Sequence, residues 1–304
     1  MARSYGAGSS PVPVRRPGRV SLLPFLLIVL LIIVLLESTV PARRAAAQTV
    51  APADVVAAAA AGYGTVGTFA VVVAKQQRPA VRTSIAAAEA RSARFAAYGA
   101  DNGLADRPFP AASMVKLFMA EDILHRARAG RLSLTPEDFA LLHAMIRSSD
   151  DPAASTLWVR FGGGQMVSDV AARYGLLGTA PPVPAGQWGR TTTTARDLAR
   201  FLSLLPVVAH PSDAAALQVW MRTTTSLAAD GFDQRFGLFG TVRGVPAVKQ
   251  GWMCCVGGNR HLHSVGVIGF RVVVLLSEVP RSVGFDVARA ALTAAASTLP
   301  LPRP

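Results

Sequence analysis

Ser113 and Lys116 form the first pair in the chain whose residue types and spacing suit catalysis. Residues three apart share one face of an α-helix, so a helix beginning at Ser113 would bring the lysine amine to the serine hydroxyl. The N–H groups at a helix N-terminus can stabilise an oxyanion, and a desolvated lysine can act as a base. The pair therefore predicts a nucleophilic serine, although Ser-x-x-Lys also occurs on ordinary surface helices.

Two further short motifs contain another serine and another lysine. They are Ser149-Asp150-Asp151 and Lys249-Gln250-Gly251. Lysine occurs only three times among the 31 basic residues, at positions 75, 116 and 249. Arginine keeps its proton at working pH, so it cannot replace a lysine that must act as a base. Two of the three lysines thus lie in motifs that suggest chemistry.

Together the three motifs resemble the Ser-x-x-Lys, Ser-Asp-Asn and Lys-Thr-Gly set of the class A β-lactamase and penicillin-binding protein superfamily. The resemblance runs in order through about residues 50–300. It includes the approach to the serine at residues 109–113 and the turn after its helix at 130–134. It also includes a threonine-rich segment at 192–199 and a Trp-Met pair at 220–221.

The resemblance implies a role for each motif residue. Ser113 would be the nucleophile that forms an acyl-enzyme, and Lys116 its general base or proton shuttle. Ser149 would pass the proton to the leaving nitrogen, while Lys249 would hold Ser149 and the substrate carboxylate. The backbone N–H groups of Ser113 and Trp252 would form the oxyanion hole. The substrate-binding residues expected beside them are Asp151, Gln250, Gly251 and Trp252.

The chain departs from the family pattern within two motifs. Asp151 stands where the family has asparagine, and a carboxylate can accept but cannot donate a hydrogen bond. We expect it to pair with Lys116 and to favour the protonated amine, or to attract a substrate amine. Asp151 is also a candidate N-cap for the helix that follows. Gln250 replaces the family's threonine or serine, and its longer amide could still donate to substrate.

The third departure concerns deacylation. No Asp or Glu occurs between Asp169 and Asp197, where class A enzymes carry the glutamate that activates the deacylating water. We expect the packing of proline and Trp188 to hold this loop. We also expect the protein to be a D,D-peptidase-like enzyme or one that hydrolyses its acyl-enzyme slowly. The alternative is a catalytically degenerate relative that binds peptidoglycan or a protein partner.

The elements that must position these residues alternate in type along the chain. Strand signals occur at 69–74, with a hairpin partner at 94–99, and again at 247–248, 264–268 and 270–276. Helices are expected near 52–61, 113–129, 136–147, from about 152, at 194–205 and at 284–298. This order predicts an α/β (α+β) fold, in which an antiparallel sheet from both chain ends is flanked by helices and carries an inserted all-α part at 113–205.

The N-terminus predicts export. Residues 1–19 form a basic tail, 20–36 are almost uniformly apolar, and 37–51 read as a linker before the hydrolase domain at 52–304. Four arginines precede the apolar segment and two follow it, which favours a cytoplasmic N-terminus and an extracytoplasmic domain. Two interpretations remain open: an uncleaved single-pass membrane anchor, or a signal peptide cut near residues 45–47.

The remaining features exclude some functions. The formal net charge is +13, but no block of like charges occurs, which disfavours nucleic acid as a partner. The adjacent Cys254 and Cys255 are either two partly buried thiols or a labile vicinal bridge. His261 and His263 are expected at a strand edge near the third motif, where they could line the cleft, but two histidines are too few for a metal site. No cofactor or metal is predicted, and the substrate expected is a β-lactam or a peptidoglycan-type peptide. The oligomeric state is not determined by the sequence.

Overall fold

The central feature of the computed structural model is a five-stranded antiparallel sheet with the order β2-β1-β7-β6-β5. The structure describes residues 51–77, 99–242 and 244–300. Strands β1 (Thr68–Lys75) and β2 (Ala100–Asp101) come from the first part of the described chain, and β5 (Ala247–Val256), β6 (Asn259–Ile268) and β7 (Arg271–Pro280) from the last. Since β1 pairs with β7 along its whole length, the prediction of a sheet built from both chain ends is confirmed.

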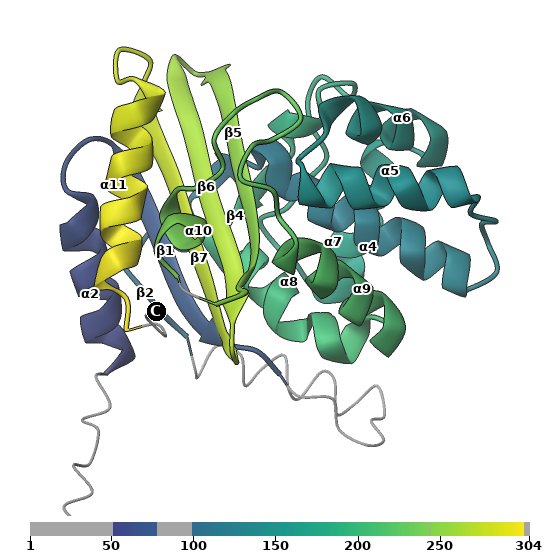
Figure 1. Ribbon diagram of the computed structural model, residues 1–304, viewed down its shortest axis with the longest axis horizontal. Coiled ribbons are helices and arrows are strands. Elements are labelled where there is room, and N and C mark those ends of the chain that lie inside the picture. The colour runs from purple at the N-terminus through teal and green to yellow at the C-terminus, as the bar shows by residue number, and fades with distance from the viewer. Residues whose placement is uncertain (1–50, 78–98, 243, 301–304) are drawn as a thin grey trace, which may run out of the picture. The chain divides into compact units, whose positions relative to one another are not determined.

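Each face of the sheet contributes to a separate apolar core. Alternate residues of a strand point to opposite faces, so the uniformly apolar β1 supplies Phe69 and Val71 to one core and Ala70 and Val72 to the other. The first core lies beneath α2 (Pro52–Tyr63) and α11 (Phe285–Thr298), which pack together on one side of the sheet (Figure 1). The second core lies beneath the helices on the opposite side (Figure 1).

The helices of the second side form the inserted part of the fold. They are α4 (Val115–Arg128), α5 (Pro136–Arg147), α6 (Asp151–Phe161), α7 (Gly164–Tyr174), α8 (Ala195–Val208) and α9 (Pro211–Arg222). The buried α4 is the central member, and both α5 and α9 pack against it. A short α10 (Gly237–Thr241) then leads back towards the sheet.

Local sequence signals account for several helix ends. Thr135 and Asp138 form a reciprocal capping box at the start of α5, and Pro136 occupies the first turn, as the sequence predicts. Thr194 caps α8 through Asp197 N–H. Gly130 adopts a φ of 69° just after α4, a conformation that glycine reaches without strain.

Several expectations about the elements need correction. The segment 108–110 forms the short strand β3 (Pro108–Pro110), which pairs with β4 (Thr192–Thr194) and is additional to the strands expected. The helical part continues through α9 to Arg222, beyond the limit of 205, because α9 packs on α4 and α5. Helices α7, α9 and α10 are additional to those expected. Strand β2 begins at Ala100, and the hairpin partner expected at 94–99 falls almost entirely outside the described residues.

The predicted anchor or signal segment, residues 20–36, also lies outside the described residues. Among the helices that the structure describes, none combines the length and the apolar character needed to cross a membrane. The choice between anchor and signal peptide stays a prediction.

The buried carboxylate of Asp197 generates a prediction about stability. Its Oδ2 accepts hydrogen bonds from Gly178 N and Thr179 Oγ1, each at 2.8 Å, and so ties the loop before β4 to α8. We expect Asp197→Ala to lower the free energy of unfolding by about 1–3 kcal/mol, because Gly178 N–H loses its acceptor and Thr179 Oγ1 keeps only its contact with Thr193 Oγ1. Urea titration followed by circular dichroism measures this, with Glu137→Ala at an exposed position as the control. Equal stability of the two variants would contradict the assignment.

Candidate active site

Ser113 lies where the chain turns from β3 into the central helix. A single turn of 3-10 helix, η1 (Ala112–Met114), holds it and leads directly into α4. Ala111 N donates to Thr191 O at 2.7 Å, which fixes this approach against the segment leading into β4. Ala112 has a φ of 47°, a strained conformation for a residue with a Cβ, and such strain is concentrated at functional sites. The helix start predicted at Ser113 is thus formed by η1 followed by α4.

Lys116 follows one turn later and is completely buried. Its Nζ donates to the backbone oxygen of Ser149 at 2.6 Å and to Asp151 Oδ1 at 2.5 Å, and lies 3.3 Å from Ser149 Oγ. The Trp188 ring covers the amine, with Nζ 4.9 Å from the ring centroid. The amine is therefore enclosed by an aromatic face, one carboxylate and Ser149.

Ser149 connects the two buried lysines. It lies between α5 and α6 with a φ of 52°, and its Oγ accepts a hydrogen bond from Lys249 Nζ at 2.7 Å. Lys249 Nζ also donates to Gln250 O at 2.8 Å. One serine hydroxyl thus lies between two ammonium groups that come from positions 116 and 249.

Burial lowers the pKa of both lysines. For Lys116, loss of hydration outweighs the opposing effect of Asp151, and the pKa falls below its ordinary value. For Lys249, burial and then the like charge of Lys116 lower the pKa well below that of a free lysine. Asp151 does pair with Lys116 as expected, and it raises the pKa of the amine against the larger, lowering effect of burial.

Asp150, rather than Asp151, caps helix α6. Its side chain accepts from Ala153 N at 2.7 Å, and Asp151 is the first residue inside the helix. The N-cap interpretation of Asp151 is therefore corrected. With Asp150 in that position, the Asp151 carboxylate is free to face the site, and 58% of its side chain remains exposed.

The edge strand β5 delivers Lys249, Gly251 and Trp252 to the site. Gly251 packs directly against the serine turn, since a Cβ built there would lie 2.9 Å from Met114 Cε and 3.2 Å from Ser113 N. Any side chain at position 251 would crowd the predicted oxyanion-hole donor. The Trp252 ring stacks on Phe232 at 4.4 Å, and its Nε1 donates to Asp230 at 3.2 Å.

Gln250 does not face the cleft, and its predicted contact with substrate is corrected here. The side chain is buried, and its Nε2 donates to the backbone oxygens of Gln234 and Phe236, the second at 2.5 Å. The reason is the alternation of a strand, which sends Lys249 to one face of β5 and Gln250 to the other. Gln250 therefore anchors the segment before α10 to β5.

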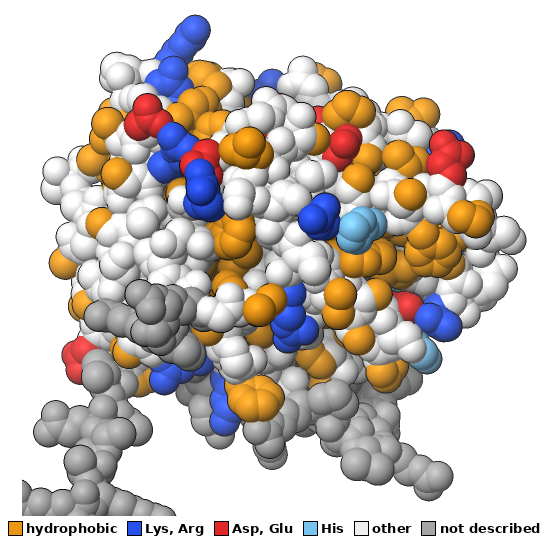
Figure 2. Space-filling model, viewed as in Figure 1, with side chains coloured by type: hydrophobic (Ala, Val, Ile, Leu, Met, Phe, Trp, Pro, Cys, Tyr) orange, Lys and Arg blue, Asp and Glu red, His pale blue; other side chains and the backbone are white. Residues whose placement is uncertain are grey.

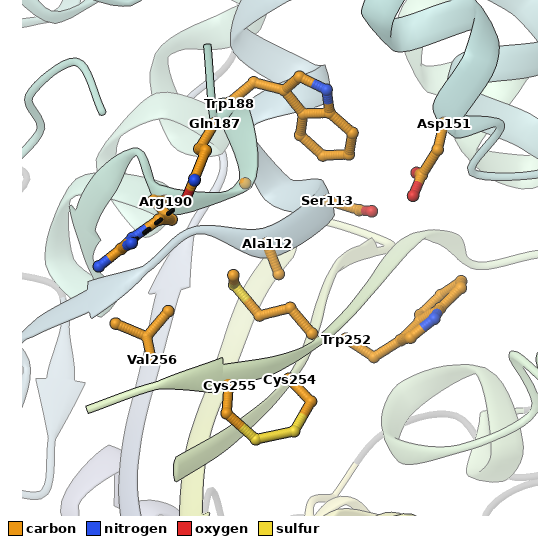
Figure 3. Close-up of a pocket in the computed structure, with 12 residues that line it drawn as sticks. Ala112, Ser113, Asp151, Gln187, Trp188, Arg190, Trp252, Cys254, Cys255 and Val256 are labelled. Carbon is orange, nitrogen blue, oxygen red and sulfur yellow. Dashed lines mark hydrogen bonds between the residues drawn. A yellow bond between two sulfur atoms is a disulfide. The ribbon is translucent and has the colours of Figure 1, made fainter. Parts of the chain in front are cut away.

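A pocket of about 270 Å³ opens at Ser113. Figure 3 shows Ser113 near its centre, with Asp151 on one side and Arg190 on the other. The floor is the end of β5, where Cys254 and Cys255 are joined in a disulfide, so the vicinal bridge of the two expected alternatives is the one formed. The residues lining the pocket are Ala112, Ser113, Asp151, Gln187, Trp188, Gly189, Arg190, Trp252, Met253, Cys254, Cys255 and Val256.

The loop before β4 forms the roof of this pocket. Trp188 begins the 3-10 turn η2 (Trp188–Arg190), packs against the helical core and donates from Nε1 to Ser155 Oγ at 3.3 Å. This agrees with the expectation that Trp188 packing holds the loop. Asp197 adds a second attachment through Gly178 and Thr179, which we did not anticipate.

The two histidines lie elsewhere. Both are buried on β6, an internal strand between β5 and β7, so their predicted position at a strand edge lining the cleft is wrong. His263 Nε2 lies 2.8 Å from Pro110 O, and burial lowers the pKa of His263 to about 3. His263 thus supports the approach to Ser113 as a neutral side chain. Among the described residues, no three His, Cys, Asp or Glu side chains are placed to hold a metal ion.

Gln187, Arg190 and Asp230 were not among the predicted site residues. Gln187 and Arg190 line the pocket, and Asp230 reaches Trp252 from the segment after α9. The only sequence signal for the first two was their place in the loop that precedes the threonine-rich segment. No spacing rule links Asp230 to Trp252, because their contact depends on how α9 and β5 pack.

Comparisons with known proteins agree with this geometry. Residues 140–275 match the profile of the β-lactamase enzyme family. The chain is 40% identical over 193 residues to proteins of Mycobacterium bovis and Mycobacterium tuberculosis named "Putative lipoprotein LppW". That match covers 62% of this chain and 61% of those relatives, so it spans less than two thirds of their length.

Solved structures share the fold. An ancestral class A β-lactamase has a TM-score of 0.58 and 18% identity, covering 80% of this chain and 98% of its own. A β-lactamase from Xanthomonas campestris pv. campestris gives a TM-score of 0.58 at 18% identity, covering 80% and 97%. Because the identity is low, this likeness concerns the fold alone. The chain therefore has the fold of class A β-lactamases, and its residues 140–275 match the β-lactamase enzyme family.

Proposed function

We propose that the protein is a serine acyltransferase or hydrolase that is acylated at Ser113 by a β-lactam or a peptidoglycan-type amide. The observation that carries the proposal is the convergence of the buried Lys116 and Lys249 on Ser149, beside a pocket that contains Ser113. Burial lowers the pKa of both lysines, which is the condition under which a lysine can act as a base.

The proposed acylation uses each group in turn. Neutral Lys116 takes the proton of the Ser113 hydroxyl as Oγ attacks the substrate carbonyl. The tetrahedral oxyanion lies against the N–H groups of Ser113 and Trp252. Ser149, held by Lys249, gives its proton to the departing nitrogen and recovers one from Lys116, which is thereby neutral again. The C–N bond breaks and the acyl group stays on Ser113.

We propose that deacylation is slow. The only carboxylate lining the pocket is Asp151, and it is engaged by Lys116 at 2.5 Å. The roof of the pocket offers Gln187, Trp188, Gly189 and Arg190, none of which can act as a carboxylate base. Water that enters the acylated site therefore lacks the activation that a free carboxylate would supply.

A second candidate function is non-catalytic binding of peptidoglycan or a protein partner. The observation that favours it is the same Lys116–Asp151 ion pair, because a lysine held as ammonium cannot accept the serine proton. The two functions differ in one measurable property, which is whether a covalent adduct forms at Ser113.

We also propose that the domain works outside the cytoplasm. Disulfides persist in oxidising compartments, and the Cys254–Cys255 bridge is of that kind. The mycobacterial relatives carry the name of a lipoprotein, which supports a domain tethered to the outer side of a membrane. Attachment through residues 20–36 remains a part of this proposal.

The first prediction concerns the site of acylation. Incubation with a labelled penicillin is expected to add one acyl group to the wild-type chain and none to Ser113→Ala, as measured by intact mass. Because deacylation is slow, the adduct should persist after excess penicillin is removed. Ser212→Ala, at an exposed position on α9, should label like wild type. Labelling that survives in Ser113→Ala, or no labelling of wild type, would refute the assignment.

The second prediction tests Lys116 as the base. Arginine keeps its proton, so Lys116→Arg is expected to slow acylation by roughly 10² to 10⁴. The acylation rate is followed by mass spectrometry, and circular dichroism verifies the fold. Lys75→Arg, at the exposed end of β1, should leave the rate unchanged. A near wild-type rate in Lys116→Arg would show that the base lies elsewhere.

The third prediction concerns pH. Only neutral Lys116 accepts a proton, so the acylation rate should rise with pH through the lowered pKa of this residue. The Asp151 carboxylate opposes the effect of burial and raises that pKa. Asp151→Asn removes this opposition, so the rising limb should move to lower pH. A pH–rate profile of both proteins measures this, and a limb that stays in place or moves to higher pH would contradict the mechanism.

A further inference from the structure

We propose that the pocket selects acyl donors whose acyl-side chain ends in an anionic group, chiefly a carboxylate, and that Arg190 is its partner. This inference rests on the proposed acyl transfer at Ser113 and specifies the class of substrate. It arises from the distribution of charge around the pocket.

Only two residues that line the pocket carry a charge, and they occupy opposite sides of Ser113 (Figure 3). The Asp151 carboxylate is engaged by the buried amine of Lys116, with Oδ1 2.5 Å from Nζ. Arg190 has no ion-pair partner among the described residues, and its Nη1 donates to the neutral Gln187 Oε1 at 3.2 Å. The pocket therefore has an engaged carboxylate at one end and an unpaired cation at the other.

The position of Arg190 is set by the backbone rather than by a flexible loop tip. Arg190 N donates to Gln187 O at 2.8 Å, and Thr191 N donates to Trp188 O at 3.0 Å, which closes the η2 turn. The guanidinium remains exposed at the pocket rim, with most of its N–H groups uncommitted. A planar fork of this kind binds a carboxylate through two parallel hydrogen bonds.

Apolar side chains line part of the surface between Ser113 and Arg190. Met253, the Cys254–Cys255 disulfide and Val256 form the floor, and Gly189 lies over it. A Cβ on Gly189 would lie 3.8 Å from Met253 Cε and 3.9 Å from Ala112 Cα, so the roof approaches the floor closely here. An acyl chain that leaves Ser113 along this path would contact apolar atoms first and a cation at its end.

A general attraction of anions by the net charge of +13 is the competing explanation. On the face shown in Figure 2, lysine and arginine side chains are spread over the surface, and several of them lie beside acidic side chains. A diffuse field of this kind would act equally on any variant that loses one exposed arginine. Selectivity that depends on position 190 alone separates the two explanations.

The experiment uses three penicillins that differ only at the end of the acylamide chain, which carries a free carboxylate, its methyl ester or an amine. Acylation rate constants are measured by intact mass for wild type, Arg190→Gln, Arg190→Glu and the remote control Arg222→Gln. Wild type and Arg222→Gln should favour the carboxylate over the ester by about tenfold, the equivalent of ~1.4 kcal/mol. Arg190→Gln should abolish the preference, and Arg190→Glu should favour the amine over the carboxylate.

Binding to Ser113→Ala, measured by calorimetry, separates this inference from the proposed function. If wild type is never acylated but Ser113→Ala still prefers the carboxylate through Arg190, the proposed function fails and the inference stands. If wild type is acylated but Arg190→Gln keeps the full carboxylate preference, the inference is overturned and the proposed function stands. A carboxylate preference that falls equally in Arg222→Gln would also overturn it, in favour of the general field.

Discussion

The arrangement of the site depends on the burial of two like charges around one serine hydroxyl. Lys116 and Lys249 are both fully buried and both approach Ser149 Oγ, at 3.3 and 2.7 Å. Burial lowers the pKa of both lysines, and the like charge of Lys116 lowers that of Lys249 further. The Asp151 carboxylate and the carbonyls of Ser149 and Gln250 partly compensate the cost of burying these amines.

The sheet and the helical part must be placed accurately for this arrangement to form. Lys116 belongs to the central helix, Ser149 to the turn between α5 and α6, and Lys249 to the edge strand. The first two segments belong to the helical layer and the third to the sheet, so the site exists only where these two layers meet. Gly251 permits the approach, because a side chain there would overlap Met114 and the Ser113 backbone. The strained φ values of Ala112 and Ser149 indicate that the surrounding packing, rather than local preference, determines these turns.

The pocket differs at its two ends in how charge is balanced. At the end near the lysines, Asp151 pairs with Lys116, and both amines are removed from water, which suits proton transfer. Near Arg190, the charge is exposed and lies against neutral groups, which suits recognition of a partner that arrives from solution. The apolar disulfide and Met253 lie between them. In this proposal α4 and β5 supply the groups for the chemistry, and the loop before β4 selects the substrate.

The sequence by itself determined the chemistry that requires particular residue types at short spacing. Ser113 with Lys116 and the scarcity of lysine predict the candidate site, and the sequence also predicts helices that begin near residues 136 and 194, because these signals depend on neighbours within a few residues. The strands at both chain ends also predict the pairing of β1 with β7. What only the tertiary structure decided depends on contacts between distant segments. Whether Asp150 or Asp151 caps α6 depended on which carboxylate Lys116 reaches. The effect of desolvation on the pKa of Lys116 outweighs that of its ion pair only because the helices and Trp188 exclude water. Strand register determines the inward direction of Gln250 and the internal position of His261 and His263. The path of a loop places Arg190 at the pocket rim. No local sequence pattern specifies either the register or the path.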